Sequence, residues 1–544
     1  MHTYIKLNCN GVNCMEGFDV IVIGSGIAGI SAAIEARDLG ASVVVLERGY
    51  GGGASGLSGG VVYAGGGTSI QKEAGIEDTP ENLFNYLSQE TQGIVKDETL
   101  RRFCEESPGM IEWLIENGAE FKGTVCEYKT SYPTDQHYLY YSGNEKAWPY
   151  MNYATPAPRG HRQVAPGMGS GNELMRRLTA TAERKGVVIL RLTRVQEWLL
   201  EDNVVHGVRV KTVDLEKMDN HKKIKKYGDK FGNWYPPLGK KLNTVAENLW
   251  EKYSTVEEIR GEKIIIAAGG FVFNQHMCAQ HIGPYKDISP LGTEGDDGTG
   301  ILLGLQAGGY PKHLSHFTAW RFMSPTSAFL EGITVNENGN RIGGEDLYGA
   351  THSHRMITEH NARGYLILDK NMWKKAKSQM KEQTQKFQRL QLNYLFTIGH
   401  KKTNTLDELA KKIHVPVEQL KTSVIEYNMG ILNGDGDPAR KTPAYCAPIQ
   451  DGPFYAIDIS IKNVPVFPAP GLSLGGLVVN EETGQLLTEA GETIPNVYAA
   501  GRSAVGICSN GYISGLSLAD GVFSGRRAGS HAVQSMKLNK LLEV

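Results

Sequence analysis

Two short apolar runs near the start of the chain are separated by a segment of small residues. Phe18–Gly24 and Ala41–Glu47 are rich in β-branched residues, and such continuous apolar runs are typical of buried parallel strands. Gly24–Leu39, between them, carries small residues on one side and predicts a helix. This strand–helix–strand unit indicates an α/β domain of the doubly wound, Rossmann-like class.

Further helices and strands follow from the same periodicities. Residues 80–118 predict helix with one buried face. Residues 186–210 contain two extended runs around Asp202-Asn203, a pair suited to a hairpin turn. Lys263–Gly270 is another buried strand that ends in glycines. Together these segments extend the α/β pattern of the first unit.

Residues 211–258 differ from their surroundings because they are rich in lysine and contain Trp234-Tyr-Pro-Pro237. We interpret them as an insertion on the surface. A lid or a membrane-surface role is one alternative, but a solvated loop is the usual structure of such a charge run.

Residues 272–449 have a different character and predict a second unit. Residues 371–392 form a polar helix, Thr405 and Glu408 fit a capping box, and Pro416 suits the first turn of a helix that runs to Asn428. We interpret this stretch as an inserted α+β domain that caps a substrate.

The chain then returns to the first unit near Pro453–Ile457. The predicted division is therefore 1–271 with 450–544 for the first domain and 272–449 for the second.

Composition excludes several classes of protein. Hydrophobic residues make up 40% and charged residues 21%, and the formal net charge is −2, so no global field favours nucleic acid. The seven cysteines are odd in number and scattered, which argues against a disulfide framework or a zinc site. Residues 1–17 lack the apolar core of a signal peptide, and no apolar run is long enough to span a bilayer. These features predict a cytoplasmic protein and leave a peripheral membrane contact open.

A glycine motif joins the first strand to its helix. Gly24, Gly26 and Gly29 form G-x-G-x-x-G with Ile27 and Ala28 inside it. Gly24 permits the tight turn, Gly26 lets a pyrophosphate approach the backbone, and Gly29 lets the helix pack on the sheet. Glu47 ends the second strand and would accept hydrogen bonds from a ribose. The motif in this context predicts a bound dinucleotide.

Later glycine elements favour FAD over NAD. Ser55–Gly60 follows the second strand closely, the strand at 263–270 ends in glycines, and Ile494–Arg502 is a strand followed by glycine near the C-terminus. These positions suit the second loop and the second flavin element of a flavoprotein with two dinucleotide-binding folds. The predicted cofactor contacts beyond the first motif are Glu47, Arg48, Ser55, Ser58, Gly59, Gly60, Val195, Ala268, Gly269, Gly501, Arg502, Ser517 and Leu518.

The order of the sequence motifs along the chain resembles one flavoprotein superfamily, that of fumarate reductase, succinate dehydrogenase and 3-ketosteroid dehydrogenase. Beyond the glycine elements, the motifs that carry the resemblance are Glu294–Gly298, Asn336–Gly339 with Glu345–Tyr348, Leu474–Val478 and Ser524–Gly529. The resemblance covers nearly the whole chain and implies an FAD-dependent CH–CH oxidoreductase.

Within the superfamily the chain is similar to the bacterial 3-oxosteroid Δ4-dehydrogenases. These carry Gly-Tyr-x-Ser-Gly near the C-terminus, where this chain has Gly511–Gly515. Tyr138–Glu145 and Pro158–His161 also resemble that branch, whereas Pro470–Gly475 lacks the histidine that fumarate reductases place there. The resemblance therefore implies interconversion of a saturated 3-oxosteroid and its 4-ene-3-oxo form, in either direction.

The resemblance also implies roles for three residues. Tyr512 would act as acid/base, Ser514 would assist it through a hydrogen bond, and the Gly515 N–H would donate to the ketone oxygen at the start of a helix. The alternative for Tyr512 is a tyrosine that only packs over the flavin, and Asp520 is expected to interact only with the helix backbone.

Other polar and aromatic residues carry less weight. His352 and His354 lack an evident third ligand, so we predict no metal site. Trp320-Arg-Phe322 lies where the family builds a steroid pocket wall. Tyr138, Tyr140 and Tyr141 are pocket candidates, although such a cluster is as often core. No tyrosine of the second unit could be assigned to proton transfer.

Two other activities stay open beside the steroid reaction. One is reduction of another unsaturated acid by a fumarate-type enzyme, which would need paired arginines in the second unit. The other is a flavin-binding protein without turnover. No further redox domain is visible, so a separate electron donor or acceptor is expected. The fumarate branch of the superfamily often links its flavin through histidine. No histidine stands in residues 55–67, so the resemblance implies non-covalent FAD here.

Overall fold

The predicted strand–helix–strand unit forms the centre of the largest sheet. In this computed structural model, which describes residues 6–9, 12–232, 236–286, 288–321, 325–462, 464 and 467–542, the unit comprises β2 (Val12–Ile23), α1 (Ile27–Asp38) and β3 (Val43–Glu47). β2 runs parallel to β3 and to β11 (Thr255–Ile266) on its other side. The predicted α/β class is confirmed.

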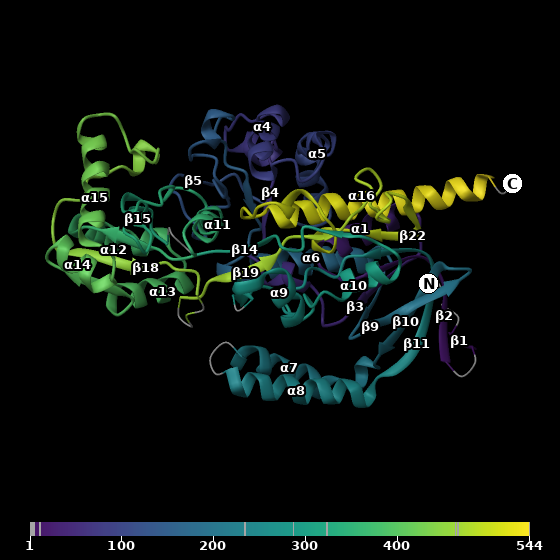
Figure 1. Cartoon of the computed structure of the whole chain (residues 1–544). Coiled ribbons are helices and arrows are strands. Elements are labelled where there is room, and N and C mark those ends of the chain that lie inside the picture. The colour runs from purple at the N-terminus through teal and green to yellow at the C-terminus, as the bar shows by residue number, and fades with distance from the viewer. Residues whose placement is uncertain are drawn as a thin grey trace.

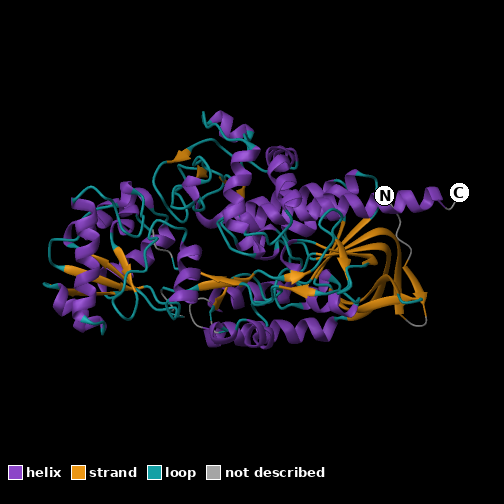
Figure 2. Ribbon diagram, turned by 45° about the horizontal axis from the view of Figure 1, so that its top comes forward, coloured by secondary structure: helices purple, strands orange, loops and turns teal. Residues whose placement is uncertain are grey.

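The sheet has nine strands in the order β21-β22-β11-β2-β3-β8, with β1, β9 and β10 attached beside this path. Figure 1 shows the elongated molecule, and Figure 2 shows the strands of this sheet gathered toward one end. The remaining strands are β1 (Lys6–Cys9), β8 (Val188–Arg191), β9 (Arg194–Glu201), β10 (Val204–Thr212), β21 (Gln485–Leu487) and β22 (Thr493–Ala499).

Both faces of the sheet are buried, as the continuous apolar runs predicted. Val20 and Val22 of β2 lie in the core beneath α1, whereas Ile21 and Ile23 lie in a second core on the opposite face. The first face is also covered by α16 (Leu516–Leu542), which packs along α1. A Cβ on Gly525 of α16 would lie 2.2 Å from the Ala28 carbonyl oxygen, so glycine permits this close helix pair.

The hairpin turn and the helical segment were also predicted, with one refinement each. Asp202 and Asn203 join β9 to β10 with φ of 48° and 64°, the left-handed values of a tight hairpin turn. Residues 80–118 form two helices rather than one, α4 (Pro80–Thr91) and α5 (Asp97–Glu116).

A small four-stranded sheet belongs to the same unit. Its order is β4-β7-β6-β5, and α4, α5 and α6 contribute core residues beside it. The elements are α2 (Gly53–Leu57), β4 (Val61–Tyr63), α3 (Ser69–Glu73), β5 (Val125–Cys126), β6 (Leu139–Tyr140), β7 (Gly160–Arg162) and α6 (Ser170–Arg184).

The lysine-rich insertion is helical, so the expectation of a solvated loop is wrong. It consists of α7 (Asp219–Gly232) and α8 (Pro236–Tyr253), which pack on each other below the sheet in Figure 1. Trp234 and Tyr235 of its central motif lie outside the described residues. Between the lysines, apolar residues recur at helical spacing. Leu242, Ala246, Leu249 and Trp250 lie on one partly or fully buried face of α8.

The second unit has a core of its own, built on the sheet β15-β16-β18-β17. The predicted polar helix is two helices, α12 and α13, and Thr405 caps α14 as expected, accepting from the Glu408 N–H at 3.2 Å. The elements are β15 (Ile333–Val335), α11 (Gly349–Glu359), β16 (Tyr365–Leu368), α12 (Lys370–Gln383), α13 (Lys386–Thr397), β17 (His400–Thr403), α14 (Leu406–Ile413), α15 (Val417–Leu432) and β18 (Phe454–Asp458).

Both boundaries of this unit lie further along the chain than expected. β18, where we expected the chain to return, pairs with β16 and β17, so that return is wrong. The core residues of this unit extend from Ala328 to Phe467. Met277 and Ile301, placed in the second unit by the sequence, lie instead in the core of the large sheet. The segment before the second unit contains α9 (Gln275–His281), β12 (Ser289–Pro290), α10 (Thr299–Gln306), β13 (Pro311–Lys312) and β14 (Phe317–Ala319), whose small strands pair with β19 (Pro470–Ser473) and β20 (Gly476–Leu477).

Candidate active site

The three glycines of the G-x-G-x-x-G motif have distinct surroundings at the junction of β2 and α1. Gly24 has φ of +106°, and a Cβ there would lie 2.4 Å from the Ala267 oxygen. A Cβ on Gly29 would lie 1.9 Å from the Gly24 oxygen, so this glycine sets the helix–strand distance. A Cβ on Gly26 would meet only the Ser55 hydroxyl, at 3.6 Å. Gly26 therefore faces open space at the positive end of α1, as phosphate binding requires.

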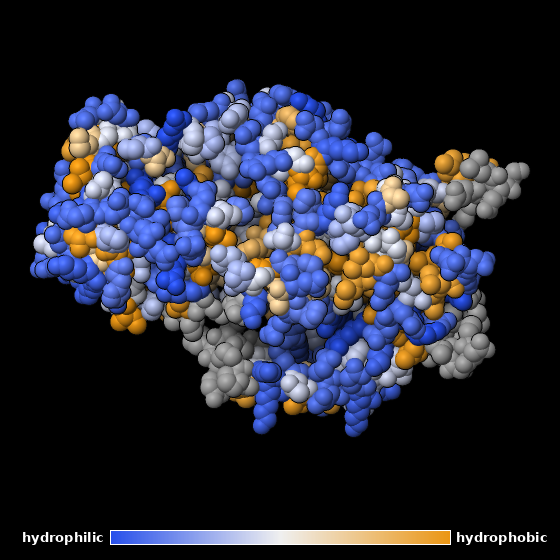
Figure 3. Space-filling model, in the orientation of Figure 1, coloured by the Kyte–Doolittle hydropathy of each residue, from blue (hydrophilic) through white to orange (hydrophobic). Residues whose placement is uncertain are grey.

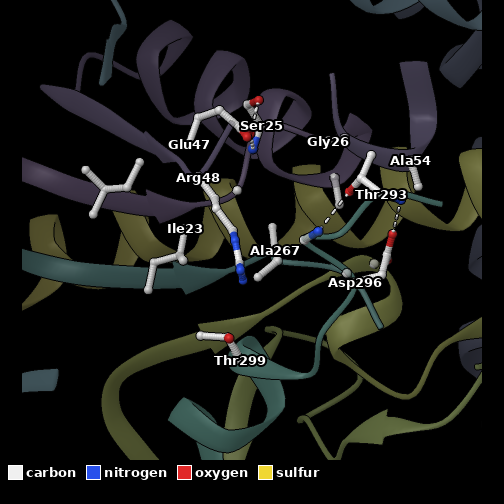
Figure 4. A pocket seen from close by; sticks show the side chains of 18 of the residues that line it. Ile23, Ser25, Gly26, Glu47, Arg48, Ala54, Ala267, Thr293, Asp296 and Thr299 are labelled. Carbon is white, nitrogen blue, oxygen red and sulfur yellow. Dashed lines mark hydrogen bonds between the residues drawn. The ribbon is translucent and has the colours of Figure 1, made fainter. Parts of the chain in front are cut away.

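Glu47 is held at the end of β3, beside the same helix. Its Oε2 accepts from the Ser25 N–H at 3.1 Å and from the Ser25 hydroxyl, and its Oε1 accepts from the Gly49 N–H at 2.6 Å. Figure 4 shows Glu47 turned toward Ser25 and Arg48 extending into the cleft. The carboxylate is therefore fixed at the position where its remaining lone pairs would accept hydrogen bonds from the hydroxyls of a dinucleotide ribose.

A cleft with about 1380 Å³ of empty space opens in front of α1. The predicted cofactor residues that line it are Gly24, Gly26, Ile27, Ala28, Glu47, Arg48, Ser55, Val195, Ala268, Gly269, Gly501, Arg502 and Ser517. Segments far apart in the chain thus meet around one space, which the carboxyl ends of β2, β3, β11 and β22 surround. That position is where open α/β sheets bind ligands.

Five predicted cofactor residues lie outside this lining: Gly29, Ser58, Gly59, Gly60 and Leu518. The contacts of Ser58 and Gly60 are with other parts of the protein. The Ser58 hydroxyl donates to the Ser55 oxygen at 2.7 Å. A Cβ on Gly60 would lie 2.3 Å from the Ser170 carbonyl carbon, so the loop after α2 packs directly against the start of α6.

Sequence reasoning missed several of the lining residues, and two groups of them are prominent. One is the turn from Thr293 to Asp297, and the other is Trp250 with Glu251 on α8. All of this turn except Thr293 belongs to Glu294–Gly298, one of the motifs that carry the family resemblance, but that motif indicated no role for its residues. The α8 residues gave no signal, because a loop was expected there.

Arg502 and Asp296 form a buried ion pair beside the cleft, with 2.6 Å between Nη2 and Oδ1. Asp296 also accepts from the Gly270 N–H at 3.1 Å and from the Thr293 N–H at 3.0 Å. The Arg502 Nη1 atom is buried and has no hydrogen-bond acceptor among the described residues. A buried donor of this kind fits a ligand acceptor, and with the open face of Gly26 it makes the cleft suitable for FAD.

Tyr512 lies just before α16, packed between aromatic rings. Its ring stacks on that of Trp320, with centroids 5.3 Å apart and planes 7° apart, and the Tyr348 ring lies 6.3 Å away. Burial, and to a smaller extent Cys508, raises the pKa of Tyr512 to about 12, against the opposing effect of Arg502. The phenol is therefore neutral at physiological pH and suited to donating a proton.

Ser514 and Gly515 connect this tyrosine to the small sheet. The hydroxyls of Ser514 and Tyr140 share a hydrogen bond of 3.2 Å. The Ser142 hydroxyl donates to the backbone carbonyl oxygen of Ser514 at 2.9 Å. Gly515 has φ of +97°, and a Cβ there would lie 2.8 Å from the Tyr63 nitrogen. The predicted trio of Tyr512, Ser514 and Gly515 is thus assembled at the N-terminal end of α16 with Tyr140 beside it.

Tyr348, just before α11, is a buried tyrosine whose ring lies beside that of Tyr512. Burial raises its pKa well above the ordinary tyrosine value, and a hydrogen bond to Ser514 opposes that shift. Its N–H donates to the Asn144 Oδ1 atom at 2.6 Å. Its place beside Tyr512 depends on the fold, so the local sequence gave no sign of it.

A smaller cavity of about 510 Å³ of empty space adjoins Tyr512, and Glu90, Asn510 and His354 contribute to its walls. The Glu90 Oε1 atom accepts from the Tyr86 hydroxyl at 2.6 Å and from the Asn144 amide at 2.7 Å. Burial raises the pKa of Glu90 to about 7, and these hydrogen bonds oppose the shift. The site thus contains a titratable carboxyl that the sequence did not indicate.

The remaining candidates occupy separate places. His352 is buried on α11 and contacts Thr334, whereas His354 is exposed. Phe322 lies outside the described residues. Asp520 is buried and its Oδ2 atom accepts from the Cys508 N–H at 3.4 Å. Over the described part of the chain, no group of three or more His, Cys, Asp or Glu residues is arranged to hold a metal ion.

Comparisons with known proteins agree with this geometry. The FAD binding domain family model (FAD_binding_2) matches residues 19–515. The chain is 35% identical to the 3-oxo-5-alpha-steroid 4-dehydrogenase of Comamonas testosteroni over 501 residues, which is 90% of this chain and 93% of that protein.

Solved structures show the same relationship. The 3-ketosteroid-delta4-(5alpha)-dehydrogenase of Rhodococcus jostii RHA1, determined with 4-androstene-3,17-dione, matches with a TM-score of 0.79 and 30% identity over 95% of this chain and 96% of that chain. The 3-ketosteroid delta1-dehydrogenase of Sterolibacterium denitrificans shares the fold, with a TM-score of 0.61 and 19% identity over 95% and 99%. The chain therefore belongs to the FAD binding domain family and is an FAD-dependent oxidoreductase.

Proposed function

We propose that the protein interconverts a saturated 3-oxosteroid and its 4-ene-3-oxo form. The observation that carries this proposal is the assembly of Tyr512, Ser514 and Gly515 at the start of α16, beside the cleft that suits FAD. The relative from Comamonas testosteroni, named for the 4-dehydrogenation of a 3-oxo-5-alpha-steroid, supports the same substrate class.

The residues divide the chemistry between them. Bound FAD supplies a hydride acceptor or donor at its N5 atom. Tyr512 takes or returns the proton on the adjacent carbon, and the Gly515 N–H at the positive end of α16 stabilises charge on the ketone oxygen. The Ser514 hydroxyl orients the neighbouring phenol groups through its hydrogen bonds to Tyr140 and Tyr348. Tyr348 is a second candidate for proton transfer.

The surroundings of Tyr512 suit an apolar substrate. Trp320, Tyr348 and Tyr140 are all buried and lie around Tyr512 and Ser514. A steroid ring system buries apolar surface best against such walls. We therefore keep Tyr140 as a pocket residue. Among the described residues, no hydrogen bond or ring contact joins Tyr138 or Tyr141 to Tyr512 or Ser514.

Two buried arginines, one just before the second unit and one within it, disfavour the fumarate-type alternative. Arg321 donates to the carbonyl oxygens of Ser460, at 2.7 Å from Nη2, and of Lys462, at 2.6 Å. Arg341 is paired with both Glu345 and Asp437 at 2.8 Å. A dicarboxylate would need free guanidinium forks, and these two are occupied by the protein itself.

The reaction also needs a redox partner, and we propose that a separate electron carrier exchanges electrons with the flavin. A peripheral membrane contact would fit a carrier in the bilayer. The structure has no helix, within the residues it describes, of the length and apolarity needed to cross one.

The first experiment mixes the purified protein anaerobically with a saturated 3-oxosteroid and follows the visible flavin band. Bleaching with formation of the enone would support dehydrogenation. If the band persists, dithionite-reduced protein is mixed with a 4-ene-3-oxosteroid, and reoxidation would support the reverse reaction. Reoxidation by a small unsaturated acid alone would overturn the steroid proposal, and reoxidation by neither substrate would favour a flavin-binding protein without turnover.

A further inference from the structure

The inserted helices α7 and α8 lie against the mouth of the FAD cleft. Trp250 and Glu251 of α8 line this cleft together with Thr193 and Val195. The space-filling view shows the surface hollowed between the inserted helices, at the bottom, and the rest of the molecule (Figure 3). The insertion thus contributes wall residues to a cofactor site that the rest of the fold builds.

One end of the insertion is fixed to the wall beside β8 and β9. Trp250 is 1% exposed, and its Nε1–H donates to the Leu192 oxygen at 2.8 Å. The Arg194 guanidinium lies 3.6 Å from the centre of the Trp250 ring, and its Nη2 donates to the Glu247 Oε2 atom at 2.8 Å. A stacked, desolvated cation of this kind is a stronger contact than an exposed one.

A second connection reaches the opposite wall. Glu294 accepts from the Lys225 ammonium of α7 at 2.7 Å and from the Asn243 amide of α8 at 3.1 Å. Glu294 belongs to the turn whose Thr293 and Asp296 line the cleft. The two helices therefore connect both walls of the cleft, at the end where β3 presents its ribose-binding carboxylate.

We propose that α7 and α8 form a clamp that holds the adenosine half of FAD in the cleft. The proposal rests on FAD binding alone and is independent of the substrate. The clamp adds contacts beyond those of the glycine motif, and it must open for FAD to leave. It acts on cofactor retention and leaves the environment of the flavin ring unchanged.

The main sheet does not need the insertion for its own pairing. β10 and β11 are antiparallel neighbours, and Thr212 lies directly opposite Thr255 at the two points where the insertion leaves and rejoins the sheet. Residues 213–254 can therefore be replaced by Asn-Gly, which suits a two-residue hairpin turn.

The clamp is tested through the rate at which the holoenzyme releases FAD after dilution, followed by the rise of free-flavin fluorescence. Lys225→Glu places a like charge beside Glu294 and should accelerate release about two- to fivefold, the range that a partly exposed pair allows. The double variant Lys225→Glu/Glu294→Lys should restore the slow rate. Lys223→Glu makes the same charge change at an exposed lysine of α7 and should leave the rate unchanged.

Two further measurements complete the test. The variant lacking residues 213–254 should release FAD at least as fast as Lys225→Glu, and both should keep the visible spectrum of the bound flavin. Release at the wild-type rate in both variants, or failure of the double variant to restore it, would overturn the clamp. An altered flavin spectrum in Lys225→Glu would also overturn it, because the contact would then act at the ring. All these readouts are independent of the steroid reaction.

Discussion

The indole of Trp320 covers the phenol of Tyr512, with ring centroids 5.3 Å apart and planes inclined by 7°. Trp320 directly follows β14, and Tyr512 lies in the loop before α16, so this contact joins two segments that are far apart in the chain. The stack holds the phenol in one orientation, and burial keeps it protonated. Orientation and protonation are the two properties that a proton donor requires.

Tyr512→Phe removes the hydroxyl and keeps the ring on Trp320. Turnover of the steroid should fall about 10²- to 10⁴-fold, the range of general acid–base catalysis. FAD binding should be unchanged, because Tyr512 does not line the cofactor cleft. Steady-state kinetics and flavin titration measure the two effects. Tyr498→Phe, a buried tyrosine bonded to His531, is the control, and equal losses in both variants would assign Tyr512 a packing role.

The high pKa of Tyr512 predicts a pH profile for enone reduction. Because the phenol loses its proton only near pH 12, the rate should not decline between about pH 7 and pH 10 through this group. A decline centred near 10, the ordinary value for tyrosine, that disappears in Tyr512→Phe would contradict the buried environment. The profile is measured with the reduced enzyme, so that the oxidative half-reaction does not limit the rate.

The sequence predicted those parts of the site whose physical reasons are local. Gly24 and Gly29 could be assigned because a tight turn and a close helix each need glycine within a few residues. Asp296, Tyr348 and Glu90 could not be assigned, because each acts through a partner brought near only by the fold. Neighbours in space but not in sequence leave no local pattern.

The fold was predictable wherever the hydrophobic period was clear. The strands and helix of the first unit follow directly from their apolar runs. The insertion was misread because its many lysines suggested a solvated surface, although Leu242, Ala246, Leu249 and Trp250 repeat at helical spacing. The boundaries of the second unit were misplaced because the pairing of β18 with β16 is non-local.

Gly26→Ala and Gly29→Ala should have different consequences. A Cβ at Gly26 meets only the Ser55 hydroxyl at 3.6 Å, so the FAD-free variant should fold with the thermal stability of the FAD-free wild type. It should nevertheless lose FAD affinity, because the methyl group would occupy the approach to the pyrophosphate. A Cβ at Gly29 collides with the Gly24 oxygen, so that variant should be destabilised or insoluble. Thermal unfolding and flavin titration separate the two, and tight FAD binding by Gly26→Ala would exclude the predicted pose.

FAD should be bound without a covalent link. The loop at residues 55–67 holds no histidine, the side chain that the fumarate branch often links to its flavin. Acid precipitation of the holoenzyme should therefore leave yellow flavin in the supernatant. Colour that remains with the washed protein pellet would contradict this prediction.

Glu90 predicts how protein stability depends on pH. The pKa of Glu90 rises from 4.5 to about 7 in the folded protein because the carboxyl is buried. The folded state therefore binds this proton more tightly than the unfolded chain does. The resulting stabilisation is complete below pH 4.5 and is lost as the pH rises through about 7. It amounts to about 3 kcal/mol, at 1.36 kcal/mol per pKa unit.

Glu90→Gln keeps the hydrogen-bond acceptor for Tyr86 and Asn144 but cannot ionise. Relative to this variant, the wild-type protein should lose about 3 kcal/mol of unfolding free energy between pH 4.5 and pH 7. Urea unfolding at a series of pH values, with FAD saturating, gives the difference directly. Glu112→Gln, an exposed position on α5, should follow the wild type throughout. Parallel curves for the wild type and Glu90→Gln would show that the carboxyl titrates as in water, and the cavity beside Tyr512 would then be open to solvent.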